Sequence, residues 1–266
     1  MRHLNDAIRR ACGGSMDEFV QARTIMANAI VANLLPNGVV KGGSAIKMRF
    51  GDADTRFTTD LDTATASNPE VYAERLNEAL HEGWQGFSGR VVKREPASPA
   101  DVPARYVMQP YDVKLTYMGK AWCTVPLEVG RNEIGDADYP DWAELTDATA
   151  LFESLGFPAL GNVPLMPFEH QIAQKLHAVT SEGDRARDLI DLQLIFARAE
   201  VDLKKVKQTC ERLFVYRKAQ AWPAIVVKQE NWDTLYAEQA DGLPVLQSID
   251  EAVQWANGLI EKIEGA

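Results

Sequence analysis

The stretch that decides the fold runs from Lys41 to Asp62 and has the sequence KGGSAIKMRFGDADTRFTTDLD. It begins with a glycine-rich turn, Gly42-Gly43-Ser44, directly after the apolar pair Val39-Val40, and it ends with Asp60 and Asp62. Side chains two residues apart on a strand point to the same face. We therefore expect Asp60 and Asp62 to project together while the residue between them, Leu61, points into a core.

This pattern predicts a site for a metal ion and a phosphate chain. Two adjacent carboxylates repel each other unless a cation lies between them, and Mg²⁺ prefers such oxygen ligands while leaving positions open for phosphate oxygens. Mn²⁺ is the alternative metal. Gly42 and Gly43 allow close backbone approach, and with the hydroxyl of Ser44 they offer donors to phosphate at a helix start. The combination indicates nucleotidyl transfer from an NTP, although an exposed strand face would also explain the acids.

A third metal-binding carboxylate is expected from a neighbouring strand. Glu128 lies in the apolar segment PLEVG, residues 126–130, whereas Asp112 lies in YDVK, residues 111–114. The apolar flanks of Glu128 favour it over Asp112, and an exposed strand acid is the alternative interpretation of either.

The chain resembles a known family at these residues. A Gly-Ser turn followed by Asp-x-Asp is typical of the DNA polymerase β-type nucleotidyltransferase superfamily, and the finer pattern Arg56-x-Thr58-x-Asp60-x-Asp62 resembles the AbiEii/AbiGii toxin branch. Two further segments, HQIAQKLHA at 170–178 and RDLIDL at 187–192, are similar to segments of the same toxins and occur in the same order. The resemblance covers roughly residues 36–200.

The resemblance implies an NTP-dependent and Mg²⁺-dependent enzyme, the toxin of a type IV toxin–antitoxin or abortive-infection system. Its implied acceptor is RNA, most plausibly a tRNA 3′ end, and a cognate antitoxin is an implied partner. A second hypothesis is nucleotidylation of a small molecule such as an antibiotic. A third is a non-catalytic binding module with a nucleotidyltransferase fold, against which the retained aspartates and glycine-rich turn argue.

Lys175 is a candidate ligand for the triphosphate. Phe168, Ile172, Leu176 and Val179 form an apolar helical stripe, and Lys175 falls at its edge, where an ammonium is costly without an acid or a phosphate. In the resembled toxins the matching lysine belongs to the active site. The alternative is a side chain that extends to solvent.

Asp188 and Asp191 lie in a segment that is apolar on nearly every side, which predicts a buried helix whose acids need partners. We expect Asp188 inside, near Lys175 or Arg187, with Asp191 slightly favoured as the acid facing the site. Either acid orients Lys175, activates the attacking hydroxyl or forms a structural salt bridge. Arg56 either binds nucleotide phosphate or pairs with Asp52 or Asp54. Asp184 is expected to cap a helix.

Bulk properties exclude several classes of protein. The 266-residue chain has a net charge of −10, which argues against a general nucleic-acid coat protein. It has no apolar run of membrane-spanning length and no secretory signal at its start. With three scattered cysteines, these features predict a cytoplasmic protein that does not contact membranes. The basic segment 201–218 either docks RNA or forms a solvated helix face.

The order of elements predicts an α+β fold with a nucleotidyltransferase mixed-sheet core and a C-terminal helical region. Apolar spacing predicts helices over 16–35, 44–49 and 69–81, and strands over 39–40, 57–64, 87–93, 105–117 and 121–129. Residues 95–103 are expected to form a loop, and 136–147 to be irregular. We expect a core domain over 1–160 and a helical domain over 161–266 that completes the active site.

Overall fold

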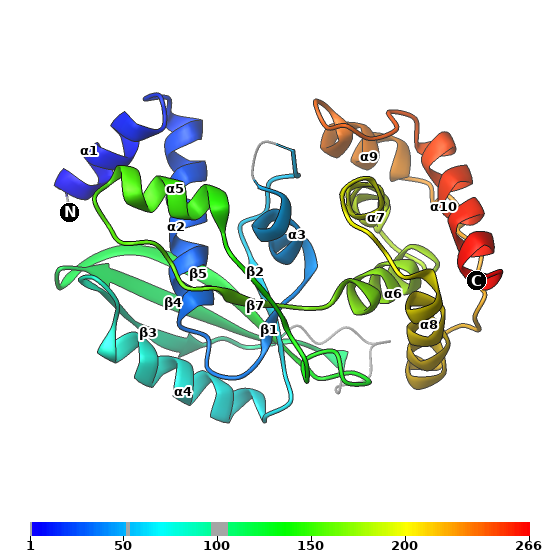
Figure 1. Cartoon of the computed structure of the whole chain (residues 1–266), viewed down its shortest axis with the longest axis horizontal. Helices are drawn as coiled ribbons and strands as arrows, with labels where there is room; N and C mark the ends of the chain where they lie inside the picture. The colour runs from blue at the N-terminus through cyan, green and yellow to red at the C-terminus, as the bar shows by residue number, and fades with distance from the viewer. Residues whose placement is uncertain (1, 52–53, 97–105) are drawn as a thin grey trace. The chain divides into compact units, whose positions relative to one another are not determined.

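The computed structural model describes residues 2–51, 54–96 and 106–266. It divides the chain into two compact units (Figure 1). The first unit comprises Met1–Gly51 and Phe57–Leu165, and the second comprises Met166–Ala266 with the described part of segment 52–56. The predicted loop over 95–103 lies mostly outside the described residues. No helix in the described ranges combines the length and the apolar character that a membrane span requires.

The first unit contains a mixed sheet and five helices in its described residues. The helices are α1 (Arg2–Ala11), α2 (Met16–Asn33), α3 (Gly42–Phe50), α4 (Pro69–Glu82) and α5 (Thr146–Ser154). The strands are β1 (Val39–Val40), β2 (Leu61–Thr65), β3 (Phe87–Lys93), β4 (Gln109–Tyr117), β5 (Lys120–Arg131), β6 (Asp141–Ala143) and β7 (Val163–Leu165).

The described strands follow the order β3-β4-β5-β2-β1-β7-β6 across the sheet. β2 runs parallel to β5, and β1 runs parallel to β7, while the remaining neighbours are antiparallel. This mixed sheet confirms the predicted fold class. The central position of β2 places the Asp-x-Asp segment between β1, which leads into the glycine-rich turn, and β5, which carries Glu128.

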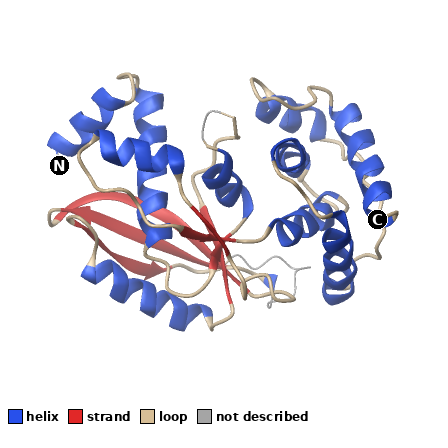
Figure 2. Cartoon of the chain, in the orientation of Figure 1, coloured by secondary structure: helices blue, strands red, loops and turns tan. Residues whose placement is uncertain are grey.

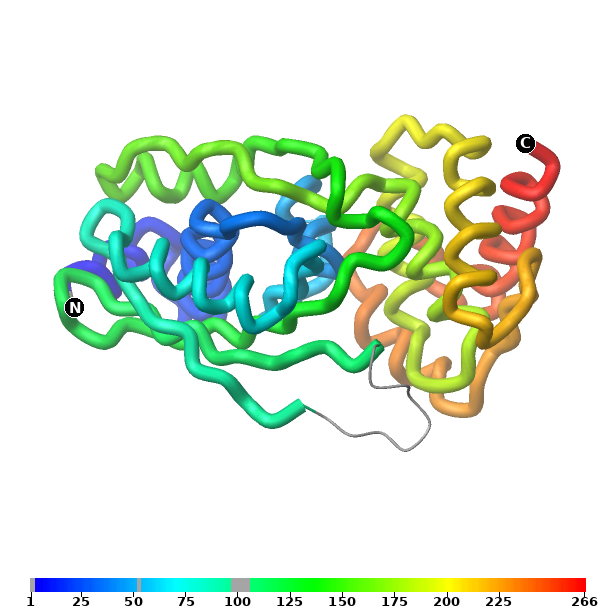
Figure 3. The backbone as a smooth tube through the Cα atoms, turned by 90° about the horizontal axis from the view of Figure 1, so that it is seen from below, coloured from blue at the N-terminus to red at the C-terminus, as the bar shows by residue number. Residues whose placement is uncertain are grey.

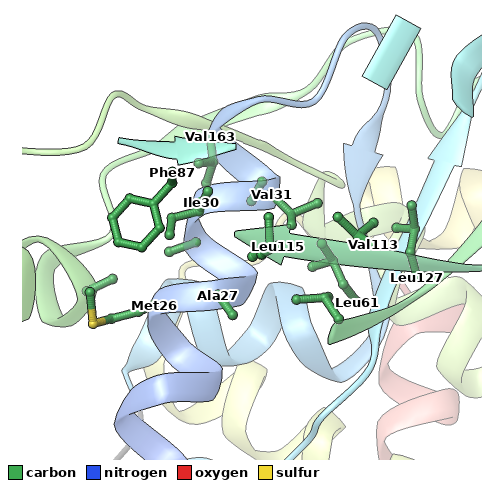
Figure 4. Close-up of a cluster of buried hydrophobic side chains, with 14 of the residues drawn as sticks. Met26, Ala27, Ile30, Val31, Leu61, Phe87, Val113, Leu115, Leu127 and Val163 are labelled. Carbon is green, nitrogen blue, oxygen red and sulfur yellow. The ribbon is translucent and has the colours of Figure 1, made fainter. Parts of the chain in front are cut away.

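One face of the sheet is buried against helices. Side chains of α2, including Met26, Ala27, Ile30 and Val31, pack with Leu61, Val113, Leu115 and Leu127 from the strands (Figure 4). Tyr111 on the same face donates its hydroxyl to the backbone oxygen of Pro69 at the start of α4. Alternation along β4 and β5 leaves the other face accessible, and that face carries Asp62 and Glu128.

The second unit consists of helices joined by loops and has no strand in its described residues (Figure 2). Its helices are α6 (Phe168–Val179), α7 (Ala186–Arg198), α8 (Leu203–Arg217), α9 (Trp232–Ala240) and α10 (Ile249–Glu264). Figure 3 traces them from yellow-green to red. Helix α7 has buried side chains on nearly every side, as its composition predicts, and it contacts α6, α9 and α10.

Several predicted boundaries were wrong. The strand of the Asp-x-Asp segment begins at Leu61 rather than at residue 57, because segment 54–56 packs with the second unit instead of the sheet. Residues 136–147 were expected to be irregular, but β6 and the start of α5 lie there, and β7 follows. The three elements are short, and the middle residue of β6 is the exposed Trp142, so they carry no clear periodic pattern.

Candidate active site

The glycine-rich turn forms the N-terminus of α3. Gly42 has a φ of +64°, a conformation that glycine adopts without strain. Lys41 is the residue that precedes the helix, and no described side chain caps the helix there. The first backbone N–H groups of a helix are unpaired within it and carry partial positive charge. This end of α3 is therefore suited to an anion such as phosphate.

Two hydrogen bonds fix the turn against the Asp-x-Asp segment. The backbone N–H of Lys41 donates to the carbonyl oxygen of Asp62 at 2.8 Å, and the hydroxyl of Ser44 donates to the carbonyl oxygen of Asp60. Ser44 is buried, so its hydroxyl holds the backbone rather than facing a ligand. The predicted glycine-rich turn is therefore present, but Ser44 stabilises its backbone and does not offer its hydroxyl to phosphate.

Asp62 packs directly against the turn. A Cβ atom built on Gly42 would overlap Oδ2 of Asp62, so only glycine leaves room for that carboxylate. Asp62 is half-buried and Asp60 is exposed, while Leu61 between them is fully buried. The predicted alternation of the three residues is therefore confirmed. A phosphate held by this turn would lie beside a carboxylate that can bind a metal.

The sheet register favours Glu128 over Asp112 as the third acid. Glu128 is directly opposite Asp62 on the adjacent strand β5, so the two side chains share one face. Asp112 lies one strand further away, opposite Pro126, and Arg94 lies 3.6 Å from its carboxylate. Asp112 therefore has a cationic partner of its own.

Charge around Glu128 is strongly negative. Partial burial and the nearby carboxylates of Asp62 and Asp60 raise the pKa of Glu128, and Lys41 opposes this shift. The ammonium of Lys41 lies over Gly130, where a Cβ atom would come within 3.0 Å of Nζ. Sequence reasoning missed Lys41, although its position just before the glycine-rich turn was a usable signal.

The carboxylates of Asp60, Asp62 and Glu128 are suited to a divalent metal that takes its other ligands from water and phosphate. Their mutual repulsion on one sheet face is the condition that a cation relieves. Within the described residues, no three His, Cys, Asp or Glu side chains are grouped closely enough to hold a metal by themselves. Mg²⁺ is typically held by one or two carboxylates together with waters and substrate phosphates, so a partly formed donor set suits it.

A second cluster of charges lies inside the helical unit. Nζ of Lys175, on α6, donates to Oδ1 of Asp188 at 2.8 Å and to Oδ2 of Asp191 at 2.5 Å, both on α7. Lys175 and Asp188 are about 7% exposed or less, and Asp191 is 1% exposed. The expectation that Asp188 lies inside near Lys175 is confirmed. Lys175 does not extend to solvent.

Arg56 completes this cluster. Its Nε and Nη2 donate to Oδ1 and Oδ2 of Asp191, each at 3.0 Å, in a two-point pairing. Of the two nearby acids that could pair with Arg56, Asp54 pairs with Arg198 at 2.8 Å, and Asp52 lies outside the described residues. Among the described residues of the cluster, the two cations and the two carboxylates balance each other in charge.

The cluster holds Lys175 and Asp191 in their charged forms. Burial alone would lower the pKa of Lys175, but the adjacent Asp188 and Asp191 outweigh burial and raise it. Burial likewise opposes charge on Asp191, yet Lys175 and Arg56 keep the pKa of Asp191 below its ordinary value. Oδ2 of Asp188 is buried without a hydrogen-bond partner among the described residues. Oδ2 of Asp188 can therefore accept a further hydrogen bond, whereas both carboxylate oxygens of Asp191 already accept one.

The predicted cap at Asp184 was wrong. Helix α7 begins at Ala186, its N-cap position is Arg185, and no described side chain caps it. The backbone N–H of Asp188 instead bonds the carbonyl of Arg185 at 2.9 Å, because a short turn precedes the helix.

Comparison with known proteins gives the family. No curated protein matches the chain. The solved structure of MenT4, a nucleotidyltransferase toxin from Mycobacterium tuberculosis, is similar, with 19% identity, a TM-score of 0.56 and coverage of 100% of this chain and 97% of that one. A putative nucleotidyltransferase from Helicobacter pylori has 17% identity, a TM-score of 0.45 and coverage of 90% and 92%. The structural likeness to MenT4 supports the fold.

The sequence family is decisive, because the model described as "Nucleotidyl transferase AbiEii toxin, Type IV TA system" matches residues 24–256. That range includes the glycine-rich turn, the Asp-x-Asp segment and the buried charge cluster. The chain belongs to the AbiEii nucleotidyltransferase toxin family of type IV toxin–antitoxin systems.

Proposed function

We propose that this chain transfers a nucleoside monophosphate from an NTP to the 3′-hydroxyl of an RNA, with tRNA as the leading acceptor, in an Mg²⁺-dependent reaction. The observation that carries the proposal is the direct packing of Gly42 against the carboxylate of Asp62. Phosphate donors and a metal-binding acid are then adjacent, and nucleotidyl transfer needs both at one phosphate chain.

The first unit would bind the nucleotide. The N–H groups at the start of α3, at Gly42 and Gly43, would bind phosphate oxygens, while Asp60, Asp62 and Glu128 would hold Mg²⁺. When bound, Mg²⁺ neutralises charge on the phosphate oxygens and orients them. Mn²⁺ satisfies the same oxygen ligands and is the alternative. Lys41 adds a positive charge close to Glu128 and limits the repulsion among the acids.

The reaction exchanges one phosphorus–oxygen bond for another. The acceptor hydroxyl attacks the α-phosphorus, a bond to its oxygen forms, and the bond to the pyrophosphate oxygen breaks. The hydroxyl proton must pass to a base. Asp188 is the better candidate of the two α7 acids, since both oxygens of Asp191 already accept hydrogen bonds while Oδ2 of Asp188 accepts none from the described residues.

Family membership supports assigning Lys175 and the two α7 acids to the same reaction. Lys175 would neutralise charge that develops on the triphosphate, and Asp191 would orient it. Arg56, paired with Asp191, would hold that carboxylate in position and would not bind phosphate directly. Membership of a type IV toxin–antitoxin family also supports a cognate antitoxin as a partner.

Transfer of an isotopic label tests the proposal. The protein is incubated with Mg²⁺, fractionated RNA and each NTP labelled at the α-phosphorus, and in parallel with NTPs labelled at the γ-phosphorus. Label on tRNA from α-labelled NTP only is the expected result. Label on a small molecule would support an antibiotic-type transferase instead, label from γ-labelled NTP would indicate a kinase, and no label would support a non-catalytic module.

A further inference from the structure

A row of polar side chains crosses three strands on the accessible face of the sheet. Arg90 on β3 is directly opposite Lys114 on β4, and Lys114 is directly opposite Thr124 on β5. Thr124 lies four residues before Glu128 on the same strand, and side chains an even number apart share a face. The row therefore lies on the face that carries Glu128 and Asp62.

The row is open to solvent and to a ligand. Arg90 and Thr124 are exposed and Lys114 is half-buried. All three line a cavity of about 480 Å³ together with the hydroxyl-bearing Ser88 and Thr116. The hydroxyl groups of Ser88 and Thr116 are 2.7 Å apart and bond each other, whereas the two cations and Thr124, like the exposed His81 that also lines the cavity, can meet a ligand.

The charges of the row are unbalanced. Like charges directly opposite each other on neighbouring strands are destabilising. Within the described residues neither Arg90 nor Lys114 has an ion-pair or hydrogen-bond partner for its side chain. By contrast, Arg94, just beyond β3, lies 3.6 Å from Asp112. An uncompensated cation pair on a chain of net charge −10 is a local feature that an anion would relieve.

We propose that Arg90 and Lys114 bind a phosphate of the acceptor strand, with Thr124 as an added hydroxyl donor. This inference rests on the proposed transfer to RNA. Glu128 is the fourth residue after Thr124 on β5, which corresponds to a distance of about 13 Å along the strand. The bound phosphate therefore lies a few nucleotides before the 3′ end that reacts at the acids.

The chemistry of the row favours a nucleic-acid strand over a protein segment. Arginine and lysine bind phosphate through charge, and hydroxyl groups donate to phosphate oxygens or sugars. Such contacts position a strand and carry no base information. The row would thus hold RNA of any sequence, and selection of the acceptor would have to come from other contacts.

Binding of a single-stranded RNA oligonucleotide, followed by fluorescence anisotropy at several salt concentrations without NTP or metal, tests the proposal. The variant Arg90→Glu/Lys114→Glu is compared with Lys204→Glu/Lys205→Glu, which makes the same charge change at exposed lysines of α8. Lys207 is left intact because its Nζ donates to the carbonyl of Glu264 at 2.5 Å. Circular dichroism checks that each variant folds.

The sheet-face variant should lose at least tenfold in RNA affinity, and its log–log salt slope should become shallower by about 0.7, the amount that one neutralised phosphate on a single strand contributes. The α8 variant should stay within threefold of wild type. Equal losses in both variants would show a net-charge effect and overturn the proposal, and loss in the α8 variant alone would move RNA binding to segment 201–218. No RNA binding by wild type would also overturn it.

Two results separate this inference from the proposed function. If wild type transfers label to RNA while the sheet-face variant binds RNA normally, Arg90 and Lys114 do not bind the acceptor, and the proposed function is still supported. If wild type transfers no label but the sheet-face variant alone loses RNA affinity, binding of RNA by Arg90 and Lys114 is supported and the proposed reaction is contradicted. Should the Glu variant not fold, Arg90→Gln/Lys114→Gln replaces it, and this change relieves repulsion and should leave the melting temperature unchanged or higher.

Discussion

Arg56 and Asp191, 135 residues apart in the chain, are joined by two hydrogen bonds of 3.0 Å. Both side chains are largely removed from solvent, at 11% and 1% exposure. A planar guanidinium matches both carboxylate oxygens at once, which an ammonium cannot do. Segment 54–56 is thereby tied to α7, and the pair is a structural element as well as part of the charge cluster.

The first prediction concerns the stability that this pair provides. Arg56→Met should lower the free energy of unfolding by about 3 kcal/mol, because it leaves a buried carboxylate short of one cation. Arg56→Lys should lose about half as much, since charge stays but two-point geometry is lost. Urea denaturation measures both. Lys93→Met, which breaks the exposed pair with Glu70, is the control and should leave the stability nearly unchanged.

A second prediction separates folding from chemistry at Lys175. Lys175→Met alone should destabilise the protein by about 3 kcal/mol, since two buried acids lose their shared cation. Adding Asp188→Asn removes one of those charges and should restore part of the stability without restoring nucleotidyl transfer. Recovery of both stability and transfer in the double variant would mean that Lys175 is only a structural cation.

Much of the first unit could be predicted because its signals are local. Strand β3 has the predicted bounds, Phe87–Lys93. The alternation of Asp60, Leu61 and Asp62 followed from the period of a strand, and the burial of Asp188 followed from the apolar surroundings of α7. These features need no knowledge of distant segments.

Other features depend on contacts between distant residues, which carry no local signal. The pairing of Arg56 with Asp191 spans 135 residues, so the sequence offered only the nearer Asp52 and Asp54 as candidates. The apolar flanks of Glu128 favoured it over Asp112, but its position opposite Asp62 depends on sheet register, and β2 pairs with β5 in parallel across more than sixty residues. The cation pair of Arg90 and Lys114 likewise emerges only from the register of β3 against β4.

A third prediction decides between the two candidate third acids. Glu128→Gln should lower transfer at least a hundredfold, about 3 kcal/mol in the barrier, and should weaken the Mg²⁺ dependence of the rate. Asp112→Asn, the matched control, should stay within about threefold of wild type. The reverse order of effects would assign the metal to Asp112.

The raised pKa of Glu128 adds a pH signature to that prediction. Because a carboxylate must be ionised to bind Mg²⁺, the metal affinity of wild type should decline as pH falls through this raised pKa. Glu128→Gln should flatten the decline, and titrations of Mg²⁺ at a series of pH values would measure it.

A fourth prediction concerns acid stability and His177. Burial first, and then the charges of Arg217 and Arg185, lower the pKa of His177 from 6.5 to about 4. Above pH 6.5 the side chain is neutral in both states and has no effect. Between pH 6.5 and 4 the unfolded chain binds the extra proton, so the free energy of unfolding should fall by up to about 3 kcal/mol as pH decreases.

Comparison of wild type with His177→Gln by urea denaturation at pH 7, 5.5 and 4.5 measures this contribution. The difference between the two proteins should change with pH, with the variant losing less stability on acidification. Parallel pH curves would show that His177 does not titrate differently on folding.

The most direct test of the account is label transfer from α-labelled NTP to RNA by wild type and by Asp60→Asn/Asp62→Asn, with folding verified for both. The account predicts transfer by wild type that requires Mg²⁺, and a loss of at least about a thousandfold, or about 4 kcal/mol, in the double variant. Transfer at the wild-type rate by the folded double variant would contradict the claim that this carboxylate pair holds the catalytic metal.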